Sequence, residues 1–282
     1  MKLAANQFDA EIKKLFCKGV YHEKIKTISQ QLLGRVYKIN PLGEDLYDQY
    51  DQSPFYRSDV FDCLTFVNTV IALAKADDLA EFAHWMLHIN YKKNKPTYLT
   101  RHHFMSVDWN PENQRHNIIE DITHDCVQDP QLIKMATAYI DRQNWLQHLS
   151  VDNLKVDESV DKKKLLKKLK SMSAKLTNEE ASIAYVPCKH IISSKKAYQF
   201  LLNQLPSVTI IEMVKPNWDL RSVIGTCLNV SHLGFLLNDG EKLTLRHASK
   251  TVGMIVDVEL YDYLFSFKSD KSLAGVNIQR LV

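Results

Sequence analysis

The sequence predicts an α+β fold in which helices come first and an antiparallel β-sheet follows. Apolar residues recur at helical spacing in the first ninety positions, and short β-rich runs separated by turns fill the chain after position 183. Hydrophobic residues make up 45% of the 282 positions and charged residues 24%, which are ordinary globular values. We expect one domain over residues 1–282, with a helical region at 5–90, an inserted region at 91–182 and a β-rich part at 183–282.

The helical region should contain a strongly apolar helix that begins near Cys63. Phe66, Val67 and Val70 fall on one side of it, and Ser58 and Asp59 precede it as candidate capping residues. Earlier apolar residues, such as Ile25 and those that follow, predict a helix before the turn at residues 40–43.

The inserted region mixes charged helices with loops that contain Pro and Asn. Its most biased segment is residues 161–170, where six lysines surround Leu165, Leu166 and Leu169. The three leucines share one helical face, which predicts a surface helix with a solvated lysine face. Contact of that face with an anionic surface is the alternative interpretation.

The β-rich part contains strand-like runs at 208–214, 232–237 and 242–246. Asn238-Asp239-Gly240 separates the last two and is a strong hairpin signal. Pairing around this turn places His232 opposite about residue 246, so His232 and His247 should lie at the same end of the hairpin.

Composition argues against several classes of protein. A net charge of +3, without a concentrated basic face, does not indicate a nucleic-acid partner. The chain has only 8 glycines and neither a phosphate loop nor a dinucleotide-binding motif. Its five cysteines are odd in number and lack CxxC spacing, so neither a zinc ribbon nor a disulfide framework is expected.

The sequence also predicts that the chain does not cross a membrane. Its longest mostly apolar stretch, residues 63–76, is shorter than the ~20 residues that a membrane span requires. Asp9 and Glu11 stand where a signal peptide would have an apolar core, so we expect no export signal in this sequence.

Three residues are candidates for nucleophilic chemistry. Cys63 lies at the expected start of a helix, where unpaired N–H groups and the helix dipole lower the pKa of a thiol. His232 and His247 on adjacent strands suit a relay, in which one imidazole takes the thiol proton and the other orients it. A small core cysteine and two unrelated histidines among the eleven are the alternative interpretation.

These residues and their surroundings resemble the NlpC-type cell-wall cysteine hydrolases, whose fold is papain-like with permuted elements. The closer resemblance is to the N-acetylmuramoyl-L-alanine amidase-like family, formerly a domain of unknown function. The most specific segments are Asp62-Cys63-x-Thr65-Phe66-Val67 and Arg246-His247-Ala248-Ser249. Further similar segments, in the same order, are residues 33–37, 41–44, 101–109, 121–123, 185–187 and 231–235.

The resemblance implies a role for each matching residue. Cys63 matches the nucleophile, His232 the general base, and His247 the residue that orients it. Tyr37 matches a tyrosine that approaches the nucleophile and supports the oxyanion hole. Asp62, Ser231 and Arg246 match the motifs as residues near bound substrate.

The resemblance also implies the reaction, which is hydrolysis of the amide between N-acetylmuramic acid and L-alanine in peptidoglycan fragments, with a preference for anhydro-muropeptides. It implies no metal and no other cofactor. A peptidoglycan substrate suggests the periplasm or cell envelope, with a cytoplasmic recycling enzyme as the alternative. An endopeptidase of the same fold and an inactive muropeptide-binding protein remain open as alternative functions.

The inserted region is expected to shape the substrate pocket. Arg101 and His103 are candidates to bind sugar hydroxyls or a carboxylate, and Trp109 to stack on a sugar ring. Alternatively, Arg101 closes a local ion pair and Trp109 belongs to the core. His102 and His103 are adjacent, and a strand would point them to opposite faces, so we do not expect a metal site there.

Overall fold

The computed structural model describes residues 6–269 and 272–282, and within them the fold is α+β, as the sequence predicts. Its centre is a mixed sheet of ten strands in the order β2-β1-β9-β8-β7-β6-β10-β5-β4, with β3 paired to β10. The described strands are β1 (Val36–Tyr37), β2 (Val60–Phe61), β3 (Ile119–Asp121), β4 (Lys134–Ile140), β5 (Glu179–Pro187), β6 (Val208–Asp219), β7 (Cys227–Asn238), β8 (Leu243–Ser249), β9 (Met254–Glu259) and β10 (Gly275–Leu281).

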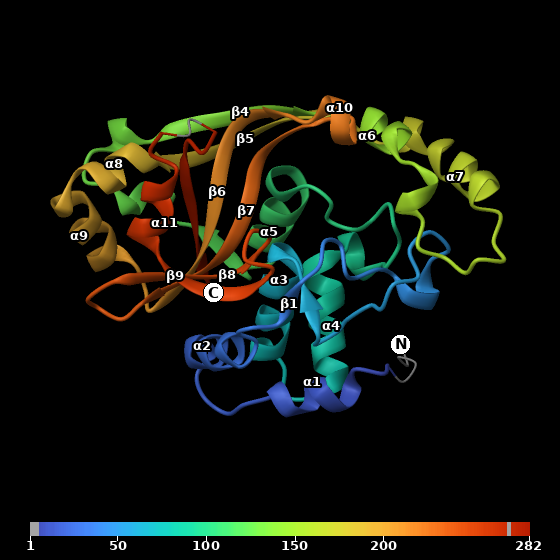
Figure 1. Cartoon of the computed structure of the whole chain (residues 1–282), viewed down its shortest axis with the longest axis horizontal. Helices are drawn as coiled ribbons and strands as arrows, with labels where there is room; N and C mark the ends of the chain where they lie inside the picture. The colour runs from blue at the N-terminus through green and yellow to red at the C-terminus, as the bar shows by residue number, and fades with distance from the viewer. Residues whose placement is uncertain (1–5, 270–271) are drawn as a thin grey trace.

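The helices occupy both sides and one end of this sheet, as Figure 1 shows. The described α-helices are α1 (Asp9–Leu15), α2 (Tyr21–Gln31), α3 (Cys63–Lys75), α4 (Leu79–Asn90), α5 (Asn110–Arg115), α6 (Arg142–His148), α7 (Lys162–Lys170), α8 (Cys188–Ser193), α9 (Lys195–Gln204), α10 (Arg221–Ile224) and α11 (Leu260–Ser266). A π-helical turn, Met105–Trp109, leads into α5. The 3-10 turns are Asp45–Tyr47, Lys92–Asn94, Thr123–Cys126, Pro130–Leu132, Val151–Asn153 and Ser173–Lys175.

Helix α3 is the central helix of the larger core. Its residues from Phe66 to Ala74 are all buried, because it lies between α2, α4 and the sheet. The sequence predicted the start of this helix, but Ser58 and Asp59 do not cap it. Asp62 is the N-cap instead, and it forms a capping box with Thr65.

A second core lies on the opposite face of the sheet. There α8, α9 and α11 bury residues such as Leu202 and Leu264 against Ile211 and Leu245 of the sheet. Residues of one strand therefore reach different cores in alternation, since Ile210 packs with the α3 core and Ile211 with this one.

The inserted region contributes more to the sheet than the sequence predicted. We expected loops and charged helices over residues 91–182, and the structure adds β3, β4 and the first residues of β5. Strand β4 pairs along its length with β5. Helix α7 agrees with the prediction, because Leu165 and Leu169 are buried while most of its lysines are exposed. Figure 1 shows α6 and α7 together at one end of the molecule.

The hairpin of β7 and β8 forms around the predicted turn, but its register differs from the prediction. Phe235, not His232, pairs with Arg246. The displacement by three residues reflects a longer turn, in which β7 continues to Asn238 and β8 starts only at Leu243. His232 and His247 still lie at the same end of the hairpin, which is the part of the prediction that matters for the site.

Among the described residues, the structure has no helix that is both long and apolar enough to span a membrane.

Candidate active site

Cys63 is the first residue of α3, and the residue as a whole is partly exposed although its sulfur is desolvated. The Asp62 side chain accepts hydrogen bonds from the backbone N–H of Thr65 and of Asn40, so it fixes the chain just before the thiol. The backbone N–H groups of Leu233, Leu64 and Cys63 itself act on the sulfur and favour its thiolate form. Since Leu233 directly follows His232, the tip of α3 meets β7 beside the candidate base.

The electrostatics of the thiol correct one prediction. The helix start was expected to lower the pKa of Cys63, but burial, followed by the negative charge of Asp62, raises it to about 12. Desolvation thus outweighs the N–H groups at the helix start. In the free protein Cys63 is a neutral thiol, and it needs a base before it can act as a nucleophile.

His232 and His247 form a direct pair. His232 Nε2 lies 2.6 Å from His247 Nδ1, and the two ring planes stand at 77°. Gly234 explains how the rings meet, because a side-chain carbon at this position would lie 2.8 Å from the Cβ of His247. The missing side chain lets His247 reach diagonally across the strand pair to His232.

This contact determines which nitrogen of His232 is available. With Nε2 engaged by His247, Nδ1 is the nitrogen left to accept a proton, and no hydrogen bond within residues 6–269 and 272–282 occupies it. Burial lowers the pKa of both imidazoles, and His247 lowers that of His232 further. Both imidazoles are therefore neutral, and Nδ1 of His232 is able to accept a proton.

Two tyrosines complete the surroundings of the thiol. Tyr37 of β1 has its pKa raised to about 12 by burial and then by Cys63 and Asp62, so its hydroxyl lies within the field of the nucleophile. Tyr263 of α11 was missed in the sequence. Its ring lies 5.5 Å from that of His247, and burial followed by Cys63 raises its pKa to about 12. No motif marked Tyr263, because only the packing of α11 brings it here.

The other motif residues have structural partners. The Ser231 hydroxyl donates to the backbone oxygen of Met213. Arg246 is buried and forms a bidentate ion pair with Asp257, while its Nη1 donates to Ser29 of α2. Arg246 therefore joins the sheet to α2, and it lies on the opposite face of β8 from its neighbour His247.

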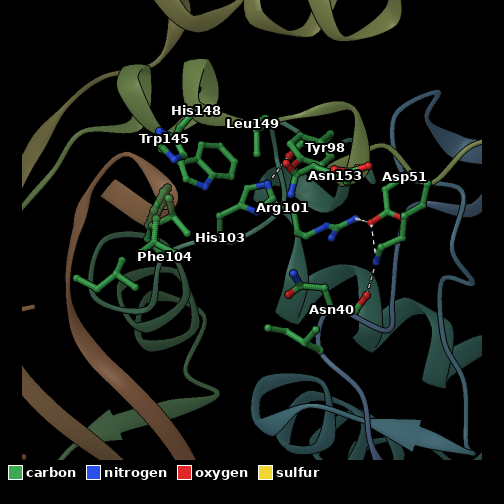
Figure 2. A pocket seen from close by; sticks show the side chains of 16 residues that line it. Asn40, Asp51, Tyr98, Arg101, His103, Phe104, Trp145, His148, Leu149 and Asn153 are labelled. Atoms are coloured by element: carbon green, nitrogen blue, oxygen red, sulfur yellow. Dashed lines mark hydrogen bonds and ion pairs between the residues drawn. The ribbon is translucent and has the colours of Figure 1, made fainter. Parts of the chain in front are cut away.

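A sizeable cavity lies near Asn40, whose backbone N–H bonds Asp62, but Cys63, His232 and His247 do not line it. Its volume is about 420 Å³, and Figure 2 shows how Trp145, His103 and Phe104 form one wall while Arg101, Asp51 and Asn40 lie across from them. A second cavity of about 120 Å³ shares Asn40, Arg101 and His103 with the first. The second cavity reaches Asp62 and Leu64, the two sequence neighbours of Cys63.

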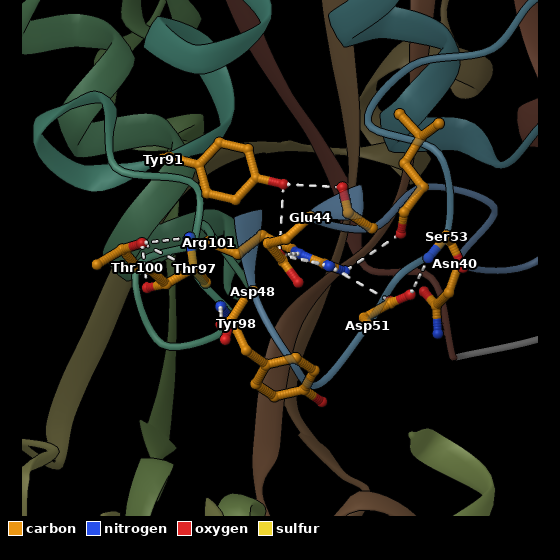
Figure 3. Close-up of polar contacts among 12 residues, drawn as sticks. Asn40, Glu44, Asp48, Asp51, Ser53, Tyr91, Thr97, Tyr98, Thr100 and Arg101 are labelled. Carbon is orange, nitrogen blue, oxygen red and sulfur yellow. Dashed lines mark hydrogen bonds and ion pairs between the residues drawn. The ribbon is translucent and has the colours of Figure 1, made fainter. Parts of the chain in front are cut away.

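Arg101 stands between the two cavities and is held by acids (Figure 3). Its Nε donates to Glu44 at 2.6 Å, and its Nη2 contacts Asp51 at 3.3 Å. Gly43 is required there, because a side-chain carbon would lie 2.4 Å from the Asp51 carboxylate. Of the two interpretations of Arg101, the structure shows the ion pair.

Trp145, and not the expected Trp109, is the tryptophan that lines the cavity. Trp109 is 0% exposed and donates its indole N–H to Asn68, so no sugar can reach its ring and the core interpretation is correct. Trp145 of α6, which the sequence did not single out, is partly exposed and lines the cavity. The ring centroid of His103 lies 4.5 Å from that of Trp145, and its Nε2 is hydrogen-bonded to the backbone oxygen of Tyr98.

The part of the chain that the structure describes contains no group of three or more His, Cys, Asp or Glu side chains arranged to hold a metal ion. Its five cysteines are free, and three of them are buried.

Comparison with solved structures identifies a close relative. A protein from Legionella pneumophila strain Philadelphia 1, assigned to the DUF1460 family, is 36% identical with a TM-score of 0.90, over 97% of this chain and 94% of its own. No curated protein matches the chain significantly.

Two Bacteroides structures share the fold at lower identity. An N-acetylmuramoyl-L-alanine amidase from Bacteroides uniformis is 20% identical with a TM-score of 0.59, over 93% of this chain and 99% of its own. A Bacteroides fragilis protein whose name proposes a xylanase is 22% identical with a TM-score of 0.60, over 90% and 98%. The different names show that the fold alone does not define the activity.

The profile of the N-acetylmuramoyl-L-alanine amidase-like family matches residues 27–270, which include the nucleophile candidate and both histidines. The chain therefore belongs to the N-acetylmuramoyl-L-alanine amidase-like family.

Proposed function

We propose that this protein is a cysteine amidase that hydrolyses the bond between N-acetylmuramic acid and L-alanine in peptidoglycan fragments, with anhydro-muropeptides as its preferred substrates. The observation that carries the proposal is the 2.6 Å contact between His232 of β7 and His247 of β8, next to Leu233, whose backbone N–H acts on the Cys63 sulfur. Family membership supports the choice of bond. In this proposal the fold is the permuted papain-like fold of NlpC-type hydrolases.

The first half of the reaction forms a thioester. His232 Nδ1 takes the proton of the Cys63 thiol as the sulfur attacks the lactyl carbonyl carbon of the muramic acid. The resulting tetrahedral intermediate breaks its C–N bond, and His232 gives the same proton to the leaving nitrogen of L-alanine. The stem peptide departs with a free amine, and the sugar acid remains bound to the sulfur.

The second half releases the sugar acid. His232 removes a proton from a water molecule, whose oxygen adds to the thioester carbon. The C–S bond then breaks, the sulfur regains a proton from His232, and a carboxylic acid leaves. His247 stays hydrogen-bonded to Nε2 throughout, which keeps Nδ1 directed at the sulfur and stabilises the imidazolium.

Two donors are placed to stabilise the oxyanion. The Asp62 carboxylate takes the N–H groups of Thr65 and Asn40, and the Cys63 N–H at the helix start, which favours the thiolate in the free protein, turns to the substrate oxyanion in this proposal. The Tyr37 hydroxyl is the second donor, because Cys63 and Asp62 act on it and it is protonated at neutral pH. Both groups are near the sulfur before the substrate arrives, so little reorganisation is needed.

The larger cavity suits an uncharged sugar better than an acidic peptide. Trp145 provides a partly exposed aromatic face, and Asn40 and Asn153 provide amide groups. The cations at the cavity already have acidic partners, since Arg101 pairs with Glu44 and Asp51, and Lys155 lies 3.7 Å from Asp51. We therefore place the glycan in this cavity and the stem peptide away from it. Asp62, Ser231 and Arg246 act in this scheme by supporting the residues that touch substrate.

A peptidoglycan substrate places the protein in the periplasm or cell envelope, and recycling in the cytoplasm is the alternative. Cell fractionation with an antibody to the protein distinguishes the two.

The test is product analysis of anhydro- and reducing-end muropeptides by mass spectrometry. We expect a free stem peptide and an intact sugar acid, with faster turnover of the anhydro form. Cys63→Ala should abolish the products, while Cys17→Ala, a matched change at another partly exposed cysteine, should retain them. A shortened stem would instead indicate an endopeptidase, and binding without turnover by the unaltered protein would indicate a muropeptide-binding protein.

A further inference from the structure

Glu212 is an acidic residue that the proposed reaction does not use. It lies in the middle of β6 and is 0% exposed. Its neighbours across the sheet are Leu233 of β7 and Asn277 of β10. A buried carboxylate normally has a cation or several hydrogen-bond donors beside it, because desolvation of the charge is costly.

Glu212 has neither. Asn110, the first residue of α5, donates from Nδ2 to Glu212 Oε2 at 3.0 Å. Within residues 6–269 and 272–282, the second carboxyl oxygen, Oε1, has no partner, and the same is true of Oδ1 of Asn110. One polar pair therefore contains two unsatisfied buried oxygens.

An exchange of the amide oxygen and nitrogen of Asn110 would not resolve this, because an ionised carboxylate offers only acceptors. A proton on Glu212 resolves both deficits together. A protonated carboxyl and a carboxamide can form two hydrogen bonds in opposite directions, with the acid O–H donating to Oδ1 and the amide N–H donating to the acid carbonyl oxygen.

The charges that face Glu212 favour this neutral form. Asp121 of β3 is the charged group whose field acts on it, and it has the same sign. From β10, Asn277 donates to Asp121, and from α5, Gln114 donates to Gln279, so these neighbours are neutral amides. On β7 the facing residue is Leu233. Burial, opposed by Asn110 and reinforced by Asp121, raises the pKa of Glu212 to about 8.

We propose that Glu212 is a protonated carboxylic acid in the folded protein and forms a doubly hydrogen-bonded neutral pair with Asn110. The pair joins α5 to β6 beside Leu233, whose backbone N–H acts on the Cys63 sulfur. Glu212 is thus a positioning residue. Loss of its proton at alkaline pH removes one hydrogen bond and leaves a charge in the core, which loosens the support under the catalytic strand.

Infrared spectroscopy tests the protonation directly, whether or not the protein is an amidase. We expect the unaltered protein at pH 6 to show the carbonyl band of a protonated carboxylic acid that shifts in heavy water and disappears in Glu212→Gln. If Glu212→Gln fails to fold, Asn110→Leu serves instead, because it keeps the proton and should shift the band to the position of an unpaired acid. No difference in this band between the unaltered protein and the variants overturns the proposal.

The stability of Glu212→Gln as a function of pH provides an independent test. The folded protein holds a proton that the unfolded chain releases between pH 4.5 and about 8. The unfolding equilibrium constant of the unaltered protein, relative to that of Glu212→Gln, should therefore rise about tenfold per pH unit in this window and level off above it. A constant ratio contradicts the proposal.

Activity provides the last readout. The kcat of Glu212→Gln should match that of the unaltered protein at pH 6 and decline less toward pH 9, because its amide cannot ionise. Equal decline in both proteins would show that Glu212 does not position the site. A protein inactive at all pH values would contradict the amidase proposal and leave the infrared and stability tests decisive for Glu212.

Discussion

The corner formed by Cys63, His232 and His247 differs from the lining of the larger cavity in how its polar groups are used. At the corner, Nδ1 of His232 is available and the Cys63 thiol still carries its proton. In the cavity lining, Arg101 directs its guanidinium at Glu44, Asp51 and the backbone oxygen of Leu42. His103 is hydrogen-bonded to the backbone oxygen of Tyr98. Groups with unused bonding capacity are available for chemistry, whereas groups whose bonds are filled hold the structure.

The two regions also differ in origin. The corner forms where α3 starts close to the neighbouring strands β7 and β8, so regular secondary structure determines its geometry. The cavity lining comes from α6, the loop after α4 and the segment around Asn40, which are distant in sequence and meet only through side-chain contacts. Substitutions at the corner should therefore change turnover, and substitutions in the cavity lining should change substrate affinity or stability.

The largest effect is expected for His232→Ala. Without a base, the neutral thiol has no acceptor for its proton, so kcat/KM should fall by about 10³-fold or more. Steady-state kinetics on a muropeptide, with the melting temperature as a control for folding, measures this. A loss below tenfold in a folded variant would remove His232 from the base role.

His247→Ala should reduce kcat by about 10²-fold, with little change in KM, because orientation of the base contributes less than proton transfer itself. His247→Asn keeps a group able to hydrogen-bond His232 Nε2 and should recover part of the rate. A larger loss for His247→Ala than for His232→Ala would reverse the two roles.

Trp145→Ala tests whether the cavity binds the sugar. If a sugar packs on this ring, KM should rise about fivefold while kcat changes little, since one aromatic contact is worth ~1 kcal/mol. Trp145→Phe, the matched control, should stay close to the unaltered protein. Unchanged KM for the glycan substrate, in a folded Trp145→Ala protein, would place the sugar elsewhere.

The smallest effect concerns acid pH. An imidazole with an ordinary pKa near 6.5 would lose about nine-tenths of its neutral form at pH 5.5 and lower kcat/KM about tenfold. Because burial lowers the pKa of His232, kcat/KM should change by less than about threefold between pH 7 and 5.5. A tenfold decline over this interval, without unfolding, would show that the relay is already protonated there.

Stability, unlike activity, should depend on the buried histidines in this range. Burial lowers the pKa of His103, His232 and His247 in the folded protein, so below pH 6.5 the unfolded chain binds more protons. The contribution of these histidines to the free energy of unfolding should therefore fall as the pH decreases from 6.5 toward 4, opposite in sign to that of Glu212, and chemical denaturation at several pH values provides the control for the kinetic measurement.

Sequence reasoning succeeded where the signal was local. The α+β class, the apolar helix that begins at Cys63, the turn at Asn238-Asp239-Gly240 and the amphipathic α7 all follow from residue patterns over a few turns or strands. It was wrong about the hairpin register and the pKa of Cys63, and it missed β3, β4, Tyr263 and Trp145. Each of these depends on residues far apart in the chain.

The sequence by itself determined which residues carry reactive groups and that His232 and His247 share one end of a hairpin, because helix starts and tight turns are encoded by neighbouring residues. Only the tertiary structure decided the state of those groups. Burial raises the pKa of the thiol and lowers that of both imidazoles, and partners from distant segments occupy Arg101 and Trp109. Desolvation and hydrogen-bond saturation depend on what surrounds a group in space, and a linear pattern does not contain that information.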